Sequence, residues 1–115
     1  MTRPTLHMVS AAVWAGRDPV APYLPADYAA DGFIHCTDGD DAMVATANGF
    51  YRDDPQAFVV LTVDLEATGS PWRFDDPEQR FPHVYGPIDP GAVLEVRRMV
   101  RGPGGEFTGI ASLES

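Results

Sequence analysis

The stretch Asp31-Gly32-Phe33-Ile34-His35-Cys36-Thr37 decides how this chain folds around its polar site. Its apolar residues predict a short strand, and successive side chains of a strand point to opposite faces. Ile34 and Cys36 are therefore expected on one face. The other face then carries three residues, Phe33, His35 and Thr37. An imidazole in the middle of an apolar strand indicates a place where a polar site meets the core.

All three histidines of the chain lie in strand-like segments between residues that suit a buried face. His7 lies in the first such segment, and His83 lies in 81–87, with Tyr85 on the same face. A single histidine of this kind is most simply a hydrogen-bonded core or edge residue, because buried polar groups normally have partners. Three of them together, counting His35, favour a shared polar cleft.

Length and composition indicate one globular domain that spans 1–115. The chain has 115 residues, of which 44% are hydrophobic, and this is enough for one core but not for two. No apolar run approaches the roughly 20 residues that span a bilayer, and no signal-peptide segment follows Met1. One cysteine cannot form an internal disulfide, so we expect a cytoplasmic protein. We expect this protein to be a monomer or a small homo-oligomer.

The charge of the chain argues against nucleic acid and membrane surfaces as partners. Seventeen acidic residues face eight basic ones, which gives a formal net charge of −9. Nucleic-acid binders usually carry a basic surface, and anionic membranes repel an acidic one. All the basic residues are arginines, so Schiff-base chemistry by a lysine is excluded. A few placed arginines can still hold a small phosphorylated ligand.

Hydrophobic patterning predicts an α+β fold in which two small antiparallel or mixed sheets surround a cleft. The apolar, β-branched run 57–63 is expected to be a central strand, buried on both faces. The other expected strands are 5–9, the stretch around His35, 71–74, 81–87 and 92–99, with 106–110 either a last strand or a loose end. A short N-terminal helix is expected at 11–15, with Ser10 as its cap.

The main helix is expected over about 38–51. Asp38 or Asp40 suits its N-terminus, where the helix dipole favours carboxylates. Apolar residues then recur at spacings of three and four and predict one buried stripe, made of Met43, Val44, Ala47, Phe50 and Tyr51. Asn48 lies at the edge of this stripe, where its side chain is either solvated or turned into the cleft.

A proline-punctuated loop over 17–30 is the longest segment without a regular pattern. Loops of this length inside compact domains are often lids or binding loops. Its aromatic residues also have area to bury, which favours packing against the sheet. The sequence leaves both roles open.

Several common chemistries do not fit the residues. A structural zinc site needs several thiolates or histidines at short spacings, and this chain has one cysteine and three scattered histidines. His7, His35 and His83 could together bind a metal ion if their strands converge. Their spacing in the sequence gives no support for such a site, so no metal is expected. Cys36 points away from His35 on a strand and is expected to be a small buried hydrophobe.

Four segments together resemble the small bacterial family known as domain of unknown function 952. They are the His7 strand, Gly32–Thr37, Ala47–Tyr51 and Phe81–Pro87. The similarity runs over about 5–99 and leaves 100–115 as a C-terminal extension. It implies a fold similar to that of the ADP-ribosyltransferases, in which two small sheets splay around a cleft that holds NAD in the active members.

The resemblance implies a cleft that binds NAD or a related small nucleotide, with NAD as a substrate for ADP-ribosyl or phosphoryl transfer. The residues expected to carry the chemistry are His35, His83 and Tyr85. The residues expected to bind the ligand are His7, Thr37 and Asn48. Glu95 is the one candidate for the glutamate with which transferases activate an acceptor. The alternative is a non-catalytic ligand-binding or accessory module that keeps the fold.

Overall fold

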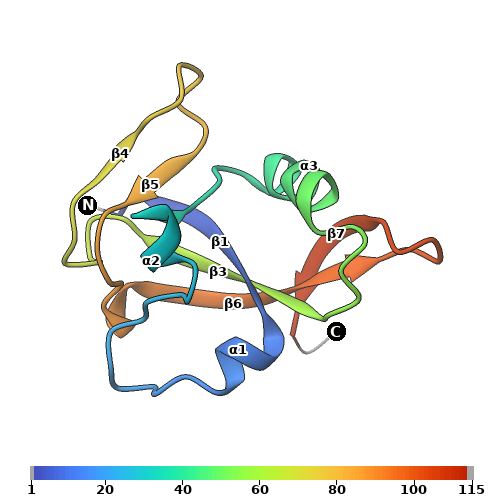
Figure 1. The fold of residues 1–115 in the computed structure, drawn as a ribbon, viewed down its shortest axis with the longest axis horizontal. Coiled ribbons are helices and arrows are strands. Elements are labelled where there is room, and N and C mark those ends of the chain that lie inside the picture. Colours follow the sequence, from blue (N-terminus) through green and yellow to red (C-terminus); the bar gives the residue numbers. More distant parts are fainter. Residues whose placement is uncertain (1, 114–115) are drawn as a thin grey trace.

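The computed structural model describes residues 2–113 and arranges them as two antiparallel sheets with few helices (Figure 1). The larger sheet has the order β1-β3-β6-β7, from β1 (Pro4–Ser10), β3 (Phe58–Asp64), β6 (Val93–Arg101) and β7 (Phe107–Ser112). The smaller sheet has the order β2-β5-β4, from β2 (Ile34–His35), β5 (Pro82–Val84) and β4 (Trp72–Phe74). The helices are α1 (Ala11–Ala15), α2 (Tyr28–Asp31) and α3 (Asp40–Phe50), with a 3₁₀ turn at Pro90–Ala92. The expected α+β class is confirmed.

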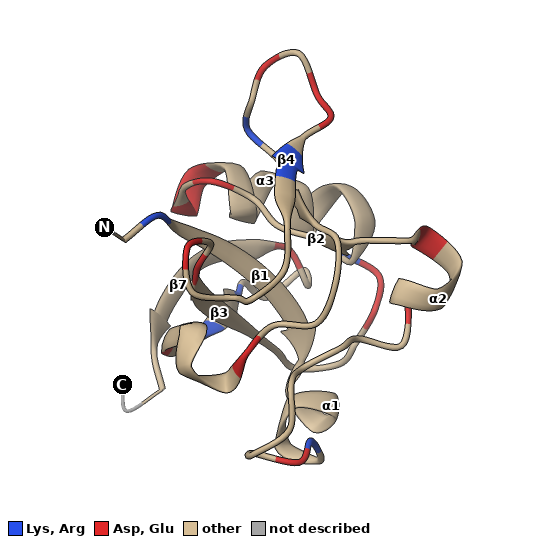
Figure 2. Cartoon of the chain, turned by 90° about the vertical axis from the view of Figure 1, so that its left-hand side faces the viewer, with Lys and Arg blue, Asp and Glu red and all other residues tan. Residues whose placement is uncertain are grey.

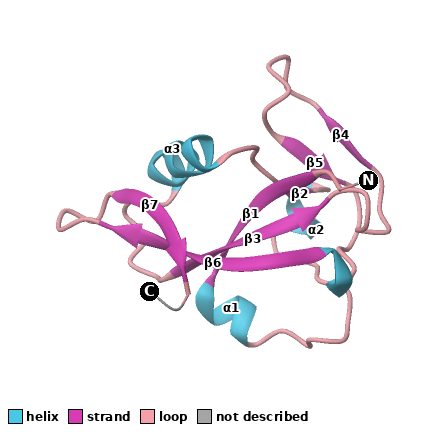
Figure 3. Ribbon diagram, turned by 180° about the vertical axis from the view of Figure 1, so that it is seen from behind, coloured by secondary structure: helices cyan, strands magenta, loops and turns pink. Residues whose placement is uncertain are grey.

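β3 is a central strand of the larger sheet and is buried on both faces, as its apolar run predicts. Val59, Leu61 and Val63 pack with core residues of the smaller sheet. Phe58 and Val60 belong to a second core, which α3 covers. Figure 3 shows α3 on one side of the long strands and the smaller sheet beyond β1. The alternation along one strand therefore creates two separate cores.

α3 begins two residues later than expected and buries a narrower stripe. Gly39, with a φ of 91°, is its N-cap, and Asp38 is drawn away because it binds Arg3 and Thr5. Met43 and Ala47 are buried, but Phe50 is 80% exposed. The prediction that Phe50 and Tyr51 are buried is wrong: Phe50 ends α3, Tyr51 follows it, and both side chains are exposed.

Register in the smaller sheet produces two rows of side chains. Ile34, Val84 and Trp72 lie directly opposite one another, and Ile34 and Val84 are fully buried. The neighbouring row consists of His35, His83 and Arg73. Directly opposed residues share a face, so the apolar row faces the core and the polar row faces away from it.

The loop over 17–30 packs against the rest of the protein through Tyr23. Tyr23 is buried, and its backbone pairs with that of Ile88. The chain then forms α2, which ends at Gly32, where a φ of 79° allows the turn into β2. The loop therefore anchors the start of the stretch that carries His35.

The C-terminal segment completes the larger sheet. β7 pairs with β6 from Arg97 to Arg101, so the expected last strand at 106–110 is confirmed and extends to Ser112. Residues 100–112 are thus part of the fold rather than an appended tail. Over residues 2–113, no helix has the length and apolar character needed to cross a bilayer.

Candidate functional site

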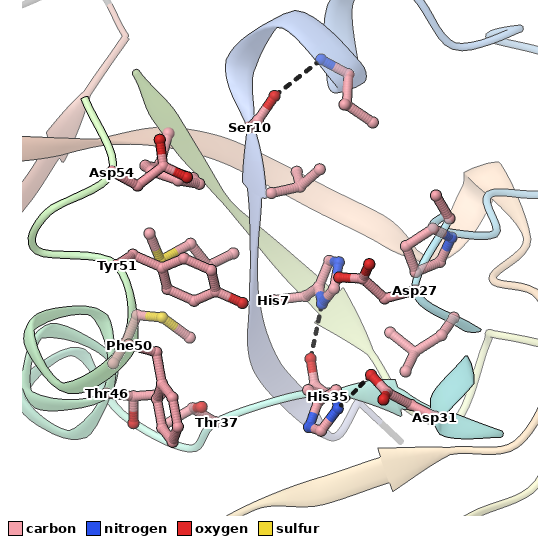
Figure 4. Close-up of a pocket in the computed structure, with 18 of the residues that line it drawn as sticks. His7, Ser10, Asp27, Asp31, His35, Thr37, Thr46, Phe50, Tyr51 and Asp54 are labelled. Atoms are coloured by element: carbon pink, nitrogen blue, oxygen red, sulfur yellow. Dashed lines mark hydrogen bonds and ion pairs between the residues drawn. The ribbon is translucent and has the colours of Figure 1, made fainter. Parts of the chain in front are cut away.

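A cavity of about 590 Å³ opens beside β1 (Figure 4). Figure 4 shows β1 running between two walls. Phe50, Tyr51 and Asp54 lie on one wall, and Asp27 and Asp31 lie on the other. The cavity therefore lies where α3 and its following loop face the 23–35 segment across an edge strand.

The floor of the cavity is the open edge of β1. Leu6 uses its outward N–H and C=O to bond Thr37, at 3.0 Å and 2.7 Å between nitrogen and oxygen. Groups alternate along a strand, so the N–H and C=O of Met8 point the same way as those of Leu6. β1 is an edge strand, and over the described chain its only bridge on this side is that between Leu6 and Thr37. A donor and an acceptor of Met8 are thus directed toward the cavity.

His7 lies beside this floor and is fixed by two hydrogen bonds. Its Nδ1 lies 2.7 Å from the carbonyl oxygen of His35 and must donate, because a carbonyl only accepts. Its Nε2 lies 2.9 Å from the hydroxyl of Tyr23 and so accepts from that hydroxyl. Burial lowers the pKa of His7 to about 4. His7 is therefore a neutral imidazole that joins β1, β2 and the 17–30 loop.

The walls of the cavity combine apolar rings with carboxylates. Phe33, Phe50 and Tyr51 line it, and Phe50 remains largely exposed at its mouth. Asp27, Asp31 and Asp54 also line it, whereas the described lining residues include no lysine or arginine. The cavity therefore suits a flat ligand that is neutral or positively charged.

His35 and Thr37, two of the expected site residues, lie on the cavity wall as well. The Nε2 of His35 lies 3.0 Å from Oδ2 of Asp31, which orients the ring and leaves Nδ1 as its other nitrogen. Because Asp31 also lines the cavity, the two residues form a carboxylate–imidazole pair at its rim. Such a pair can accept and release a proton.

His83 and Tyr85 lie next to His35 but outside the cavity lining. The rings of His35 and His83 are 5.6 Å apart, and Phe33 stacks on His83 at 3.8 Å. Nδ1 of His83 lies 2.8 Å from Asp75, and the hydroxyl of Tyr85 donates to the same carboxylate. These hydrogen bonds, with one from an arginine, lower the pKa of Asp75 to about 2. The three residues expected to carry chemistry therefore lie close together on one face.

Asn48 and Glu95 are placed elsewhere. The side-chain amide of Asn48 donates to the carbonyl of Phe107 at 2.9 Å and accepts from its N–H at 2.7 Å. We therefore correct the assignment of Asn48 to the ligand: both ends of its amide attach α3 to β7. Glu95 is exposed on β6, 3.6 Å from Arg97, and does not line the cavity.

Three other residues of the cavity lining, Asp31, Tyr23 and Asp27, were not expected at the site from the sequence. Asp31 ends α2 and His35 lies on β2, so the turn at Gly32 brings the two side chains together and no regular spacing indicates the pair. Tyr23 and Asp27 lie in the 17–30 loop, where no periodic pattern marks them. Cys36 behaves as expected: it is buried, and burial raises its pKa to about 12.

Comparison with known families shows which family the chain belongs to. A family model described as "Protein of unknown function (DUF952)" matches residues 8–96, which include the end of β1 from Met8 and the segments that carry His35 and His83. The chain belongs to this family. The membership expected from the four sequence segments is confirmed. No curated protein matches the chain.

Two solved structures are similar to this DUF952 protein over nearly its whole length. They are protein CC0527 from Caulobacter crescentus and a double mutant of the same protein. Both are 26% identical to this chain and cover 92% of it and 94% of their own chain. The TM-scores are 0.74 for CC0527 and 0.73 for the mutant. The two-sheet arrangement is therefore shared with an independently solved protein.

Proposed function

We propose that the cavity beside β1 binds the nicotinamide–ribose half of NAD or of a related small nucleotide. The observation that carries the proposal is the open edge of β1, where the N–H and C=O of Met8 face an aromatic-walled cavity. A carboxamide presents a C=O and an N–H side by side. It can therefore pair with a free strand edge as another strand would.

The charges of the cavity favour this half of the ligand over the phosphates. Asp27, Asp31 and Asp54 surround a space without an arginine among its described lining residues. A positively charged pyridinium ring suits this field, and the faces of Phe33 and Tyr51 can attract it as well. A volume of about 590 Å³ lies within the usual range for small-ligand sites. The fold similarity to ADP-ribosyltransferases, implied by the sequence resemblance, is part of this proposal.

A second proposal concerns catalysis and is carried by the Asp31–His35 pair at the rim. His35 would accept the proton of a water or of an acceptor hydroxyl. The oxygen of that water or hydroxyl bonds at the same time to the anomeric carbon of the ribose. The bond from that carbon to the ring nitrogen breaks, and its electron pair neutralises the departing nicotinamide. Glu95 lies on β6 outside the cavity lining, so the proposed step does not use it. If His35 proves dispensable for turnover, the non-catalytic alternative is favoured.

Thermal-shift measurements with nicotinamide riboside, nicotinamide, NAD, AMP and phosphate test the binding proposal. A ligand at about 100 times its Kd adds about 2.7 kcal/mol, which raises the Tm of a domain this size by roughly 10 °C or more. We expect a rise with nicotinamide riboside that Asp27→Asn reduces. The control Asp53→Asn removes the same charge from an exposed residue that does not line the cavity. No rise with either pyridinium ligand would refute the proposal.

A further inference from the structure

A polar row crosses all three strands of the smaller sheet. His35 on β2 lies opposite His83 on β5, and His83 lies opposite Arg73 on β4. Neighbouring strands are about 4.8 Å apart, so the row extends about 10 Å from end to end. Figure 2 shows the basic residue on β4 against the mostly acidic loops around it. The row places two imidazoles and a guanidinium on one face.

Each member of the row is held by a carboxylate that occupies only part of its donor capacity. Asp31 binds Nε2 of His35, which leaves Nδ1, and Asp75 binds Nδ1 of His83, which leaves Nε2. The Nε of Arg73 donates to Asp75 at 2.7 Å, so this carboxylate does not use its terminal amino groups. The carboxylates orient the three groups: Arg73 keeps its terminal amino groups as donors, and each imidazole gains a second N–H donor when it is protonated.

The row begins at the rim of the cavity. Phe33 and His35 line the cavity, and Phe33 also stacks on His83 with an interplanar angle of 16°. A ligand that leaves the cavity past His35 therefore meets His83 next and Arg73 last. Arg73 is the exposed end of this path, with 68% of its side chain accessible.

We propose that His83 and Arg73, the part of the row beyond His35, bind the diphosphate of the nucleotide whose ring and ribose occupy the cavity. This inference rests on the proposed function and supplies the place for the phosphates that the cavity itself lacks. Arg73 and protonated imidazoles form charge-assisted hydrogen bonds with phosphate oxygens, and such bonds are stronger than neutral ones. The ring half and the phosphate half thus occupy surfaces of opposite character.

Acidic groups surround the row. The titratable groups that face it are Asp31 from α2, Asp75 and Asp76 from the loop after β4, and Tyr85 after β5. The guanidinium of Arg73 is the permanent positive charge of the row, so we expect it to contribute most to the binding of a diphosphate.

Titration calorimetry with NAD, nicotinamide riboside and inorganic pyrophosphate tests the row on the full chain. One charge-assisted bond contributes at least about 1.4 kcal/mol, so NAD should bind about tenfold more tightly than the riboside. Arg73→Gln should abolish that advantage and leave riboside binding unchanged, because Arg73 does not line the cavity. Arg52→Gln, at another exposed arginine, is the matched control and should change neither affinity.

The outcomes separate this inference from the proposed function. Equal affinities for NAD and riboside, or an NAD advantage that survives both Arg73→Gln and His83→Asn, would overturn the row while the cavity proposal stands. Pyrophosphate binding that depends on Arg73, without any riboside binding, would support the row as an anion site and overturn the proposed function. Binding of none of the three would overturn both. Circular dichroism of each variant checks that it folds.

Discussion

Burial of His7 should make a measurable contribution to the loss of stability of this protein at low pH. The imidazole is 6% exposed, and burial lowers its pKa from 6.5 to about 4. Unfolding restores the ordinary pKa, so below about pH 6.5 the unfolded chain binds a proton that the folded chain does not. Stability from this residue is therefore complete above about pH 6.5 and is lost as the pH falls toward about 4.

The size of the effect follows from the two pKa values. With 6.5 in the unfolded chain and about 4 in the folded one, the free energy of unfolding falls by about 2 kcal/mol by about pH 5 and by about 3 kcal/mol by about pH 4. Protonation also converts Nε2 from an acceptor to a donor, which breaks its bond from the hydroxyl of Tyr23 unless that hydroxyl turns.

Urea unfolding of the wild type and of His7→Gln between about pH 7 and about pH 4.5 measures this loss. The variant carries the same seventeen acidic residues, so their common pH dependence cancels in the difference between the two proteins. The wild type should lose about 2 kcal/mol relative to the variant by about pH 5. A difference that stays constant over this range would refute the assignment of a buried, neutral His7.

Three further predictions concern structural contacts. Tyr23→Phe leaves Nε2 of His7 buried without a donor and should lower the free energy of unfolding by about 1–3 kcal/mol in urea titrations; an unchanged value would contradict the bond. Asn48→Ala should lower it by about 2 kcal/mol and speed amide exchange at Phe107, and exchange there as slow as in the wild type would contradict the clamp. Cys36, whose pKa burial raises to about 12, should react with thiol reagents only as fast as the protein opens, and rapid modification of the folded protein would contradict its burial.

The sequence predicts the elements of this fold better than their contacts. The run 57–63 has the composition of a doubly buried strand, and the structure has β3 there. Alternation along the two histidine strands places His35 and His83 on one face, and the register of β2 and β5 sets them directly opposite each other. Such local periodicities depend only on neighbouring residues and can therefore be recognised in one sequence.

Long-range contacts account for what the sequence did not predict. Asn48 lies on α3, but its partner Phe107 is 59 residues away on a strand whose position no local pattern sets. Phe50 follows the helical apolar period, yet at the end of α3 its side chain is 80% exposed. Asp38 suits an N-cap position, but its carboxylate accepts a hydrogen bond from Arg3, 35 residues earlier, and does not cap α3. Each difference reflects tertiary packing that overrides a local preference.

The most direct test of the account is a ¹⁵N–¹H correlation spectrum recorded while nicotinamide riboside is added. If the ligand pairs with the open edge of β1, the amide of Met8 should be among the largest chemical-shift changes, together with that of His35 at the rim. The amide of Leu94, exposed on β6, should not move. Saturable shifts that leave Met8 unchanged, or no shifts at any concentration, would contradict the claim that this cavity binds the nicotinamide–ribose half of a nucleotide.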